Sequence, residues 1–375
     1  MPMTGKTKRA SWTNWFADHP YHPAQTVLET DALVIGAGPI GLWTVFELGL
    51  QGLTCEVVDT LDEAGGQCVA LYADKPIYDI PGLPVVSGSD LTQSLLQQIK
   101  PFHAGFHFGH QVSALSRLED GRWHVQAHGV HTGKAQSFAA RSIFIAAGVG
   151  AFVPKSPKLD GVEALQGQHV FFQYPDSAPL TAGKVCVLGG EQAAVSCVLQ
   201  LIREHPALTV TLIHRRNVLK AQEADLSRLS ALQSSGRVEF VIGQVSALLT
   251  SDAAPHALRA VQVDTSEGNL IHIDAHTLVI QQGLSPKLGP LADWGLAMAR
   301  KQLSVDLETF STSQSGIYAM GDIVQYPGKR KLIVSGFHEA TQAAFAAAAV
   351  LRPEQSQVLQ YTTSSALLQK RLGLT

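Results

Sequence analysis

The sequence has few cysteines, little charge and no long hydrophobic run, and each shortage excludes a class of protein. Its 375 residues carry a formal net charge of −3, and only 16% are charged. No overall field therefore draws the chain to nucleic acid or to an anionic membrane. No apolar run reaches the length of a membrane span, and no apolar stretch follows the basic residues at the N-terminus. We expect a cytoplasmic protein without a nucleic-acid or membrane partner.

The cysteines exclude a second group of functions. Cys55, Cys68, Cys186 and Cys197 are the full set, and they form neither a CxxC pair nor a spacing typical of metal ligands. A reduced protein without a metal site is the expectation. The 45% of hydrophobic residues and the length fit a globular chain of two domains, or three with insertions.

What the sequence does contain is organised around the segment 31–59, DALVIGAGPIGLWTVFELGLQGLTCEVVD. It predicts a strand over Ala32–Ile35, a glycine turn, a helix over Pro39–Leu50 and a second strand over Cys55–Val58. The order strand, glycine turn, helix and strand is typical of a dinucleotide-binding unit.

The three glycines and the acid of this fingerprint each have a physical task. Gly36 permits the tight turn, Gly38 lets the backbone approach a pyrophosphate, and Gly41 lets the helix and strand pack closely. The free N–H groups and the dipole at the helix N-terminus favour phosphate. Asp59 follows about 20 residues later, where an acid accepts hydrogen bonds from a ribose.

A second copy of this unit follows. It predicts a strand over Lys184–Leu188, a turn at Gly189 and Gly190, a helix over Gln192–Arg203 and a strand over Thr209–Ile213. The repeat implies two nucleotides, one for each copy.

The second copy ends on basic residues instead of an acid. His214, Arg215 and Arg216 follow the strand, and Lys220 lies one helical turn beyond them. Such a cluster accommodates a 2′-phosphate and predicts NADP, although a solvated basic turn has the same composition. Glu191 occupies the position of the second fingerprint glycine, where an anionic side chain opposes a pyrophosphate. Weak NADP binding is the alternative that Glu191 leaves open.

The remaining chain predicts insertions and a return to the first domain. Short strands are expected over 106–145 and 237–281, and the aromatic, glycine-rich loop after Asp59 suggests a ligand-facing role. A strand delivers Gly321 and Asp322 to a turn, where the carboxylate can hold a ribityl or ribose hydroxyl. A helix is expected over Ser335–Leu351, with its N-terminus toward the pyrimidine edge of a flavin.

Together these motifs resemble the thioredoxin-reductase-like ferredoxin–NADP reductases, which are bacterial FAD-dependent homodimers. The resemblance runs from Asp31 to the C-terminus and rests on GAGPIG, GGQCVALYADKPIYDIPG, AAGVGAFVP, VTLIHRR, GIYAMGD, KLIVSGFHEA and TTSS. It implies an α/β fold of two Rossmann-like dinucleotide-binding domains, for FAD and NADP, with β-insertions. The implied order is an extension over 1–30, the FAD domain over 31–155 and 288–352, the NADP domain over 156–287, and a tail over the flavin at 353–375.

The resemblance also implies the cofactor contacts. For FAD these are Gly36, Gly38, Ile40, Asp59, Gln67, Tyr72, Val112, Phe152, Asp322, Thr363 and Ser364, with Tyr72 stacking on the isoalloxazine ring. For NADP they are Gly189, Gly190, Ala194, His214, Arg215 and Arg216. In relatives the tail crosses to the partner subunit and carries a histidine before its Ser-Thr pair, and this tail has no histidine.

The implied activity is the transfer of a hydride from NADPH to FAD and of single electrons onward to ferredoxin or flavodoxin. No side chain is expected to act as acid, base or nucleophile. The thioredoxin reductases are excluded because they need a CxxC pair before the second glycine turn, where this chain has Tyr174, Pro175 and Asp176. The basic run Lys329–Lys331 is either a docking site for an acidic ferredoxin or a solvated turn.

Three other functions remain open at this stage. The first is a disulfide reductase that uses Cys68. The second is an FAD protein that has lost NADP use through Glu191 and serves as a binding or sensing module. The third is an NADPH oxidoreductase that reduces a quinone or another small molecule.

Overall fold

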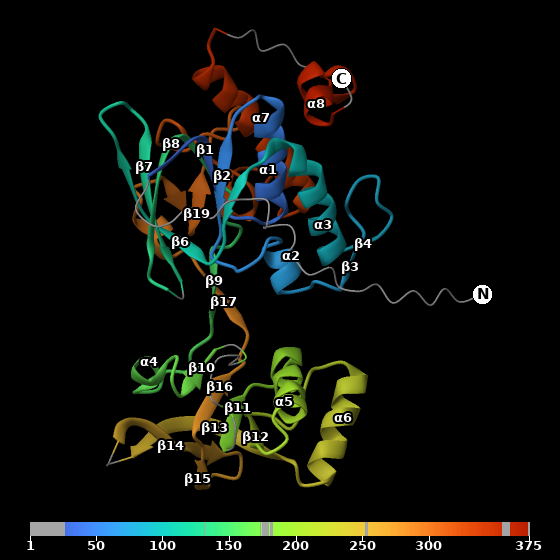
Figure 1. Ribbon diagram of the computed structural model, residues 1–375, viewed down its shortest axis with the longest axis vertical. Coiled ribbons are helices and arrows are strands. Elements are labelled where there is room, and N and C mark those ends of the chain that lie inside the picture. Colours follow the sequence, from blue (N-terminus) through green and yellow to red (C-terminus); the bar gives the residue numbers. More distant parts are fainter. Residues whose placement is uncertain are drawn as a thin grey trace, which may run out of the picture. The chain divides into compact units, whose positions relative to one another are not determined.

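The chain forms two compact units (Figure 1). The first comprises Met1–Ala151 and Pro286–Thr375, and the second comprises Phe152–Ser285. The computed structural model describes residues 27–130, 132–172, 174, 180, 183–251, 254–354 and 361–373. The second unit is thus one continuous segment inserted into the first.

A seven-stranded sheet forms the centre of the first unit, in the order β5-β2-β1-β8-β7-β6, with β20 beside β8. The strands β5, β2, β1, β8 and β20 pair in parallel, whereas β6, β7 and β8 form an antiparallel extension. The bounds are β1 (Leu28–Ile35), β2 (Cys55–Val58), β5 (Gly105–His107), β6 (His110–Arg117), β7 (Trp123–Gly129), β8 (Ala135–Ile145) and β20 (Ile317–Ala319).

The central strand β1 is buried on both faces, as expected for a parallel sheet. Ala32 and Val34 belong to the core formed with the helices, while Leu33 and Ile35 belong to the core on the opposite face. The helices on the first face are α1 (Pro39–Leu50), α3 (Gly88–Ile99) and α7 (Ile333–Leu351).

Short elements complete the described part of this unit. They are α2 (Gln67–Ala70), β3 (Pro76–Ile77), β4 (Val86–Ser87), η3 (Lys100–Phe102), η4 (Gly289–Asp293), β18 (Met298–Ala299), β19 (Gln302–Ser304), η5 (Gly321–Ile323), β21 (Val324–Gln325), η6 (Thr362–Ser364) and α8 (Ala366–Arg371).

The predicted elements of the first glycine unit are confirmed. The helix α1 and the strand β2 have the predicted bounds. The strand β1 begins at Leu28, inside the predicted extension 1–30, of which residues 1–26 lie outside the described part of the chain. The helix α7 begins at Ile333, two residues before its predicted start.

The second unit has its own seven-stranded sheet, in the order β10-β16-β11-β12-β13-β14-β15. Its strands are β10 (Val170–Phe171), β11 (Lys184–Leu188), β12 (Thr209–His214), β13 (Val238–Ser251), β14 (Ala254–Thr265), β15 (Leu270–Asp274) and β16 (Thr277–Ile280). Its helices are α4 (Val162–Leu165), α5 (Gln192–Glu204) and α6 (Glu223–Ser234). The predicted repeat of strand, glycine turn, helix and strand is therefore present as β11, α5 and β12.

The chain passes between the units in two paired strands, β9 (Ala151–Pro154) and β17 (Leu284–Lys287). The unit limits lie within a few residues of the predicted limits 31–155 and 156–287. The assignment of FAD to the first unit and NADP to the second stays a prediction at this point.

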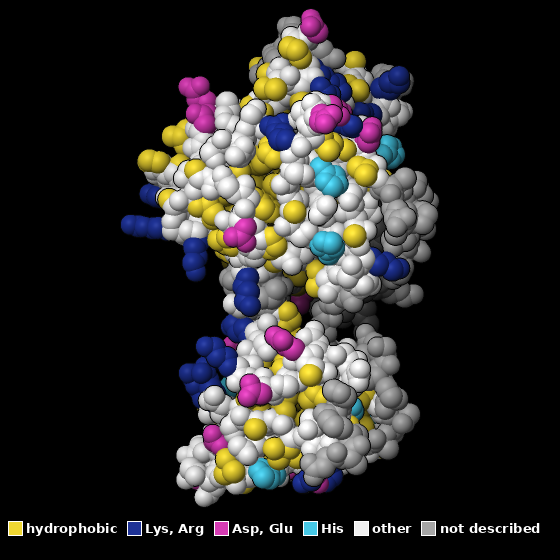
Figure 2. Space-filling view, turned by 90° about the vertical axis from the view of Figure 1, so that its left-hand side faces the viewer, with side chains coloured by type: hydrophobic (Ala, Val, Ile, Leu, Met, Phe, Trp, Pro, Cys, Tyr) yellow, Lys and Arg dark blue, Asp and Glu magenta, His cyan; other side chains and the backbone are white. Residues whose placement is uncertain are grey.

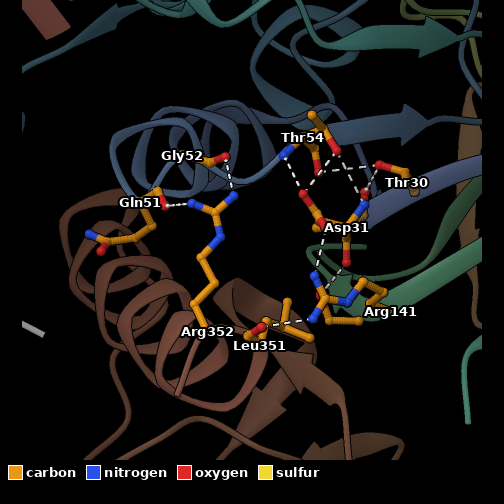
Figure 3. A network of polar contacts seen from close by, with 10 residues as sticks. Thr30, Asp31, Gln51, Gly52, Thr54, Arg141, Leu351 and Arg352 are labelled. Carbon is orange, nitrogen blue, oxygen red and sulfur yellow. Dashed lines mark hydrogen bonds and ion pairs between the residues drawn. The ribbon is translucent and has the colours of Figure 1, made fainter. Parts of the chain in front are cut away.

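Two arginines cap the C-terminal ends of α1 and α7 (Figure 3). Arg352 donates to the carbonyls of Gln51 and Gly52, at 3.1 and 2.7 Å, just beyond α1. Arg141 donates to the carbonyl of Leu351, the last residue of α7, at 2.7 Å. A cation at a helix C-terminus satisfies free carbonyls and complements the helix dipole. These contacts fix the two helices at the ends away from the glycine turn.

Candidate functional site

The first glycine turn is built so tightly that only glycine fits at two of its positions. Gly36 has φ of 108°, and a Cβ there would collide with the carbonyl of Ala146. A Cβ on Gly41 would collide with the carbonyl of Gly36, so the first turn of α1 rests directly on the turn. Gly38 is the N-cap residue of α1, and no side chain caps the helix there. The free N–H groups of α1 are left for an anion.

Asp59 holds this turn from the end of β2. Its Oδ2 accepts a hydrogen bond from the Ala37 N–H at 2.6 Å, and its Oδ1 accepts one from the Leu61 N–H at 2.8 Å. Burial raises the pKa of Asp59, and the N–H donors from Leu61 and Ala37 oppose that rise. The carboxylate thus lies at the sheet edge beside the turn, where the fingerprint predicts a ribose contact.

The backbones of Gly38 and Gly66 lie next to each other and form a ledge at the N-terminus of α1. A Cβ built on Gly38 would meet only the Cα of Gly66, at 3.8 Å, and a Cβ on Gly66 would lie 3.0 Å from the Cα of Gly38. Two backbone segments without side chains, at Gly38 and at Gly66, therefore lie side by side at the N-terminus of α1. Such a cradle without side chains is what a pyrophosphate needs for close approach.

Three further segments meet at this place. Gln67, at the start of α2, donates from Nε2 to Oδ2 of Asp322 at 3.3 Å. A Cβ on Gly148, which follows β8, would lie 3.1 Å from the same Nε2. Ile40 packs against Gly321, which precedes Asp322. The predicted FAD residues Ile40, Gln67 and Asp322 are thus brought together with the first turn.

The other predicted FAD residues have different surroundings. Val112 is a buried residue of β6, in the core on the face opposite the helices. Phe152 lies in β9, and its side chain is outside the described part of the structure. Tyr72 follows α2, and its hydroxyl lies 3.4 Å from Sγ of Cys68.

The surroundings of Cys68 keep its thiol protonated. Burial raises the pKa of Cys68 above its ordinary value, although the contact with Tyr72 opposes this, and burial also raises the pKa of Tyr72. Because the thiolate is the reactive form, this environment does not support a disulfide-reductase role for Cys68.

Thr363 and Ser364 do not lie at the first glycine turn of their own chain. Both are exposed residues of η6, and α8 follows them directly. Leu367 of α8 lies near Gly52 at the C-terminal end of α1, and Arg371 lies over the ring of Phe102 at 5.2 Å. The described tail is therefore packed at the end of α1 remote from Gly38.

The second glycine turn has the same construction in the second unit. A Cβ on Gly189 would collide with the carbonyl of Gln281, and Ala194 of α5 packs against Gly189. A Cβ on Gly190 would collide with the imidazole of His214, which therefore covers that glycine. Gly189, Gly190, Ala194 and His214 are thus assembled as one turn.

Glu191 is the N-cap residue of α5 and is exposed. Its φ of −110° and ψ of 179° suit any residue, so glycine is not required here by the backbone. Its side chain caps no N–H of the helix. The carboxylate therefore does not cap the helix N-terminus, which is the end that the coenzyme pyrophosphate would approach.

The basic residues lie beside this turn. Arg215 and Arg216 are exposed, and the Lys220 N–H donates to the Gly190 carbonyl at 2.8 Å, which returns the loop to the turn. Figure 2 shows a group of Lys and Arg side chains on the surface of the second unit. Burial and the charges of Arg215 and Arg216 lower the pKa of His214, although Glu191 opposes this. His214 is therefore neutral at pH 7, and the arginines supply the positive charge.

Lys329 fits neither interpretation of the basic run Lys329–Lys331, because it is neither a docking residue nor solvated. The side chain of Lys329 is 2% exposed and forms an ion pair with Glu339, which is 0% exposed. Arg330 and Lys331 are exposed. Only these two can meet a partner of opposite charge.

Comparison with known proteins places the chain in a family. The sequence model of the pyridine nucleotide-disulphide oxidoreductases matches residues 30–348. The chain belongs to this family. A ferredoxin–NADP reductase of Verminephrobacter eiseniae is 48% identical over 350 residues, which cover 93% of this chain and 98% of that protein. One from Albidiferax ferrireducens is 45% identical over 352 residues, covering 93% and 97%. The resemblance that the motifs predicted is confirmed.

Solved structures confirm the fold class. Thioredoxin reductase from Gloeobacter violaceus matches with a TM-score of 0.54 and 21% identity, over 89% of this chain and 98% of that one. Thioredoxin reductase from T. acidophilum matches with a TM-score of 0.53 and 18% identity, over 86% and 99%. These likenesses show a shared two-domain dinucleotide-binding fold.

Sequence reasoning named no role for three residues that the structure places at the first turn. Gly66 and Gly148 stand in quoted motifs, GGQ and AAGVG, but only the fold shows that they face Gly38 and Gln67. Glu339 stands in the motif FHEA, and its carboxylate accepts a hydrogen bond from the Gly321 N–H. No local pattern predicts that contact, because it joins a helix to the turn that precedes it.

Proposed function

We propose that this chain is a ferredoxin–NADP reductase in which FAD occupies the first unit and NADP(H) the second. One observation carries the proposal: two glycine turns in one chain carry opposite charge at the sheet edge. In the first copy of the strand–turn–helix–strand repeat, Asp59 follows the second strand, β2. In the second copy, Arg215 and Arg216 follow the corresponding strand, β12. An acid suits an unphosphorylated ribose, and a pair of arginines suits a 2′-phosphate.

The residues of the first unit fit FAD and would hold it. The N-terminus of α1 and the ledge of Gly38 and Gly66 would receive the pyrophosphate, and Asp59 would accept from the ribose hydroxyls. Gln67 and Asp322 would bind the polar chain between phosphate and ring. When bound, FAD supplies the conversion between a two-electron donor and a one-electron acceptor.

The second unit would bind the coenzyme through its backbone turn and its arginines. Gly189 and Gly190 present the turn, while Arg215 and Arg216 pair with the 2′-phosphate and select NADPH over NADH. The carboxylate of Glu191 opposes the pyrophosphate, so we propose that it weakens the binding of either coenzyme.

The thiols support a relay without a disulfide. Burial raises the pKa of Cys55, Cys186 and Cys197 to about 12 and raises that of Cys68 as well. All four are therefore protonated at neutral pH and are poor nucleophiles. Electrons leave through the flavin to ferredoxin, and we propose flavodoxin as a second acceptor of the same one-electron class.

The exposed tail supports a homodimer. Thr363 and Ser364 lie remote from the first turn of their own chain, so a flavin that they contact belongs to a second copy. We propose a homodimer in which each tail serves the other subunit, and sedimentation of the purified protein tests it.

No helix in the described ranges is both long enough and apolar enough to cross a bilayer. A cytoplasmic location stays a prediction.

The function is tested with the purified full-length protein. We expect a yellow protein whose flavin is bleached rapidly by NADPH and slowly by NADH, with reduction of cytochrome c that depends on added ferredoxin. A colourless protein that takes up no FAD contradicts the proposal. Bleaching without any ferredoxin dependence, together with reduction of quinones, favours a small-molecule oxidoreductase.

A failure of bleaching has a different meaning. The carboxylate of Glu191 gives specific support to a protein that binds FAD without using NADP. A yellow protein that NADPH does not bleach at saturating concentration favours that binding or sensing function over the reductase.

A further inference from the structure

A buried ion pair lies next to the turn that carries Asp322. Glu339, on the second turn of α7, is 0% exposed, and the side chain of Lys329 is 2% exposed. A buried pair of this kind is poorly explained as a contribution to stability, because desolvation of both charges opposes their attraction. The position of the pair suggests a role in organising the neighbouring turn.

The Glu339 carboxylate ties together both ends of one loop. Its Oε2 accepts a hydrogen bond from the Gly321 N–H at 2.7 Å. Its Oε1 accepts one from the Tyr326 hydroxyl at 2.6 Å and also pairs with the Lys329 ammonium. One side chain thus fixes the start and the end of the segment between β20 and α7.

The fixed segment contains Asp322. Gly321 has φ of 83°, a left-handed conformation that turns the chain sharply just before Asp322. Gln302 donates to the carbonyls of Asp322 and Val324, at 2.9 and 3.2 Å, and holds the other side of the turn. The Asp322 carboxylate is left facing Gln67. Its direction therefore depends on the Gly321 backbone, which Glu339 holds.

We propose that Glu339 is a positioning residue for the flavin site, which acts through Gly321 on Asp322, and that Lys329 is its buried counter-ion. Lys329 neutralises a carboxylate that would otherwise stand unpaired beside Asp322. This assignment removes Lys329 from any surface that receives ferredoxin and leaves Arg330 and Lys331 there. The inference rests on the proposed FAD site.

The test is a double-mutant cycle read out by FAD affinity. FAD dissociation constants are measured on full-length holoenzyme by dilution and ultrafiltration for wild type, Glu339→Gln, Asp322→Ala and the double variant. Glutamine keeps the shape but cannot accept from all three donors. We expect Glu339→Gln to weaken FAD binding about tenfold, and to weaken it no further once Asp322 is alanine, because coupled residues are non-additive.

A spectroscopic signature separates positioning from loss of fold. The visible circular dichroism of the bound flavin should change in Glu339→Gln in the same way as in Asp322→Ala. Arg330→Gln/Lys331→Gln is the matched surface control, with unchanged FAD affinity and an unchanged flavin spectrum. If Glu339→Gln yields no folded protein, Tyr326→Phe replaces it in the same cycle, with an expected loss of about threefold.

The outcomes are distinct. Wild-type FAD affinity in Glu339→Gln, or effects that add fully with Asp322→Ala, overturn the inference while the proposed function stands. The same holds for Tyr326→Phe if it is used. A wild-type protein that binds no FAD refutes the proposed function itself.

Discussion

Single residues give the two glycine turns opposite charges, and we propose that these charges decide which nucleotide each turn holds. Asp59 places a negative charge beside the first turn, while His214 is neutral at pH 7 because its pKa is lowered. The positive charge at the second turn is therefore carried by Arg215 and Arg216. Coenzyme preference should depend on these arginines and not on the histidine.

Replacing both arginines should remove the preference for NADPH. For Arg215→Ala/Arg216→Ala we expect KM for NADPH to rise by roughly tenfold to a hundredfold, since a hydrogen bond to a charged group contributes about 1.5–3 kcal/mol. KM for NADH should stay within twofold. Steady-state kinetics with both coenzymes measure this. His214→Gln is the control, and it should change KM for NADPH and KM for NADH by the same factor. An unchanged NADPH preference in the double variant contradicts the prediction.

Removing Glu191 should improve coenzyme binding. The Glu191 carboxylate lies at the N-terminus of α5, where the coenzyme pyrophosphate would bind. Two like charges about 4 Å apart repel each other by roughly 1–4 kcal/mol, depending on exposure. We expect Glu191→Gly to lower KM about tenfold for NADPH and NADH alike, because both carry the pyrophosphate. Glu191→Gln separates charge from size: an effect confined to the glycine variant assigns the obstruction to size. No change in either variant shows that the side chain turns away.

Cys68 should be inert. Its pKa is raised above 9.0, so below pH 8 less than about one tenth of the thiol is ionised, and the thiolate fraction grows only as pH rises past that value. Iodoacetamide should label Cys68 slowly at pH 7.5 and faster above pH 9. Cys68→Ser should keep NADPH-dependent ferredoxin reduction within twofold. A large loss of turnover would restore the disulfide-reductase interpretation.

At this scale the sequence predicts what local backbone geometry dictates. Gly36 and Gly41 could be assigned from spacing because each is required within one strand–turn–helix unit. The burial of Lys329 could not, since a lysine beside two exposed basic residues looks the same in sequence whether or not Glu339 lies across from it.

At the scale of elements, α1 and α7 run in the same direction and are fixed at both ends. Ile40 of α1 packs against Gly336 of α7 near the first glycine turn. Arg352 and Arg141 hold the opposite ends (Figure 3). The N-termini of α1 and α7 near the first glycine turn are therefore supported by contacts at the far end of each helix.

Removing the Arg352 side chain, which clamps the C-terminal end of α1, should destabilise the first unit. Arg352→Ala leaves the carbonyls of Gln51 and Gly52 without their donor, and we expect the free energy of unfolding to fall by about 2 kcal/mol. Denaturant titration of the flavin-bound protein measures this. Arg228→Ala is the control: Arg228 is 73% exposed in its pair with Asp225, and loss of such a pair costs at most about 1 kcal/mol. Equal losses in both variants contradict a clamp.

Element bounds could be predicted where punctuation is strong. Pro39 marks the start of α1, and Gly52, just beyond the helix, marks its end. The predicted bounds of α1 are those observed. The sequence predicts the start of α7 two residues too late, because no capping side chain precedes Ile333. The position of the tail could not be predicted, since it depends on packing of α8 against residues more than 250 positions away.

The whole molecule consists of two units with separate hydrophobic cores. The cores of the first unit draw on segments before Ala151 and after Pro286, whereas those of the second lie within Phe152–Ser285. The second unit therefore has hydrophobic cores of its own.

The isolated second unit should fold and bind coenzyme. For a protein of Phe152–Ser285 we expect cooperative thermal unfolding and a Kd for NADPH within about threefold of that of the full chain, because separate cores behave additively. Isothermal titration calorimetry and circular dichroism measure both. The Arg215→Ala/Arg216→Ala version is the control that should lose NADPH but still fold. A soluble but unfolded product would show that the unit needs its neighbour.

The fold class and its two nucleotide units could be read from the repeat of the glycine fingerprint. The residues at which the chain leaves one unit for the other could be placed only to within a few positions. Gly150 and Gly283 precede β9 and β17 and mark turns, but only the fold shows that these two short strands pair with each other.

These two paired strands have one more consequence. Because the second unit begins in β9 and ends in β17, and these two strands pair with each other, its two ends are already held side by side. If this unit binds NADP(H), as proposed, a different coenzyme-binding domain that begins and ends on such a pair of strands could be grafted there. The choice of electron donor would then change while the proposed FAD-binding unit is left as it is.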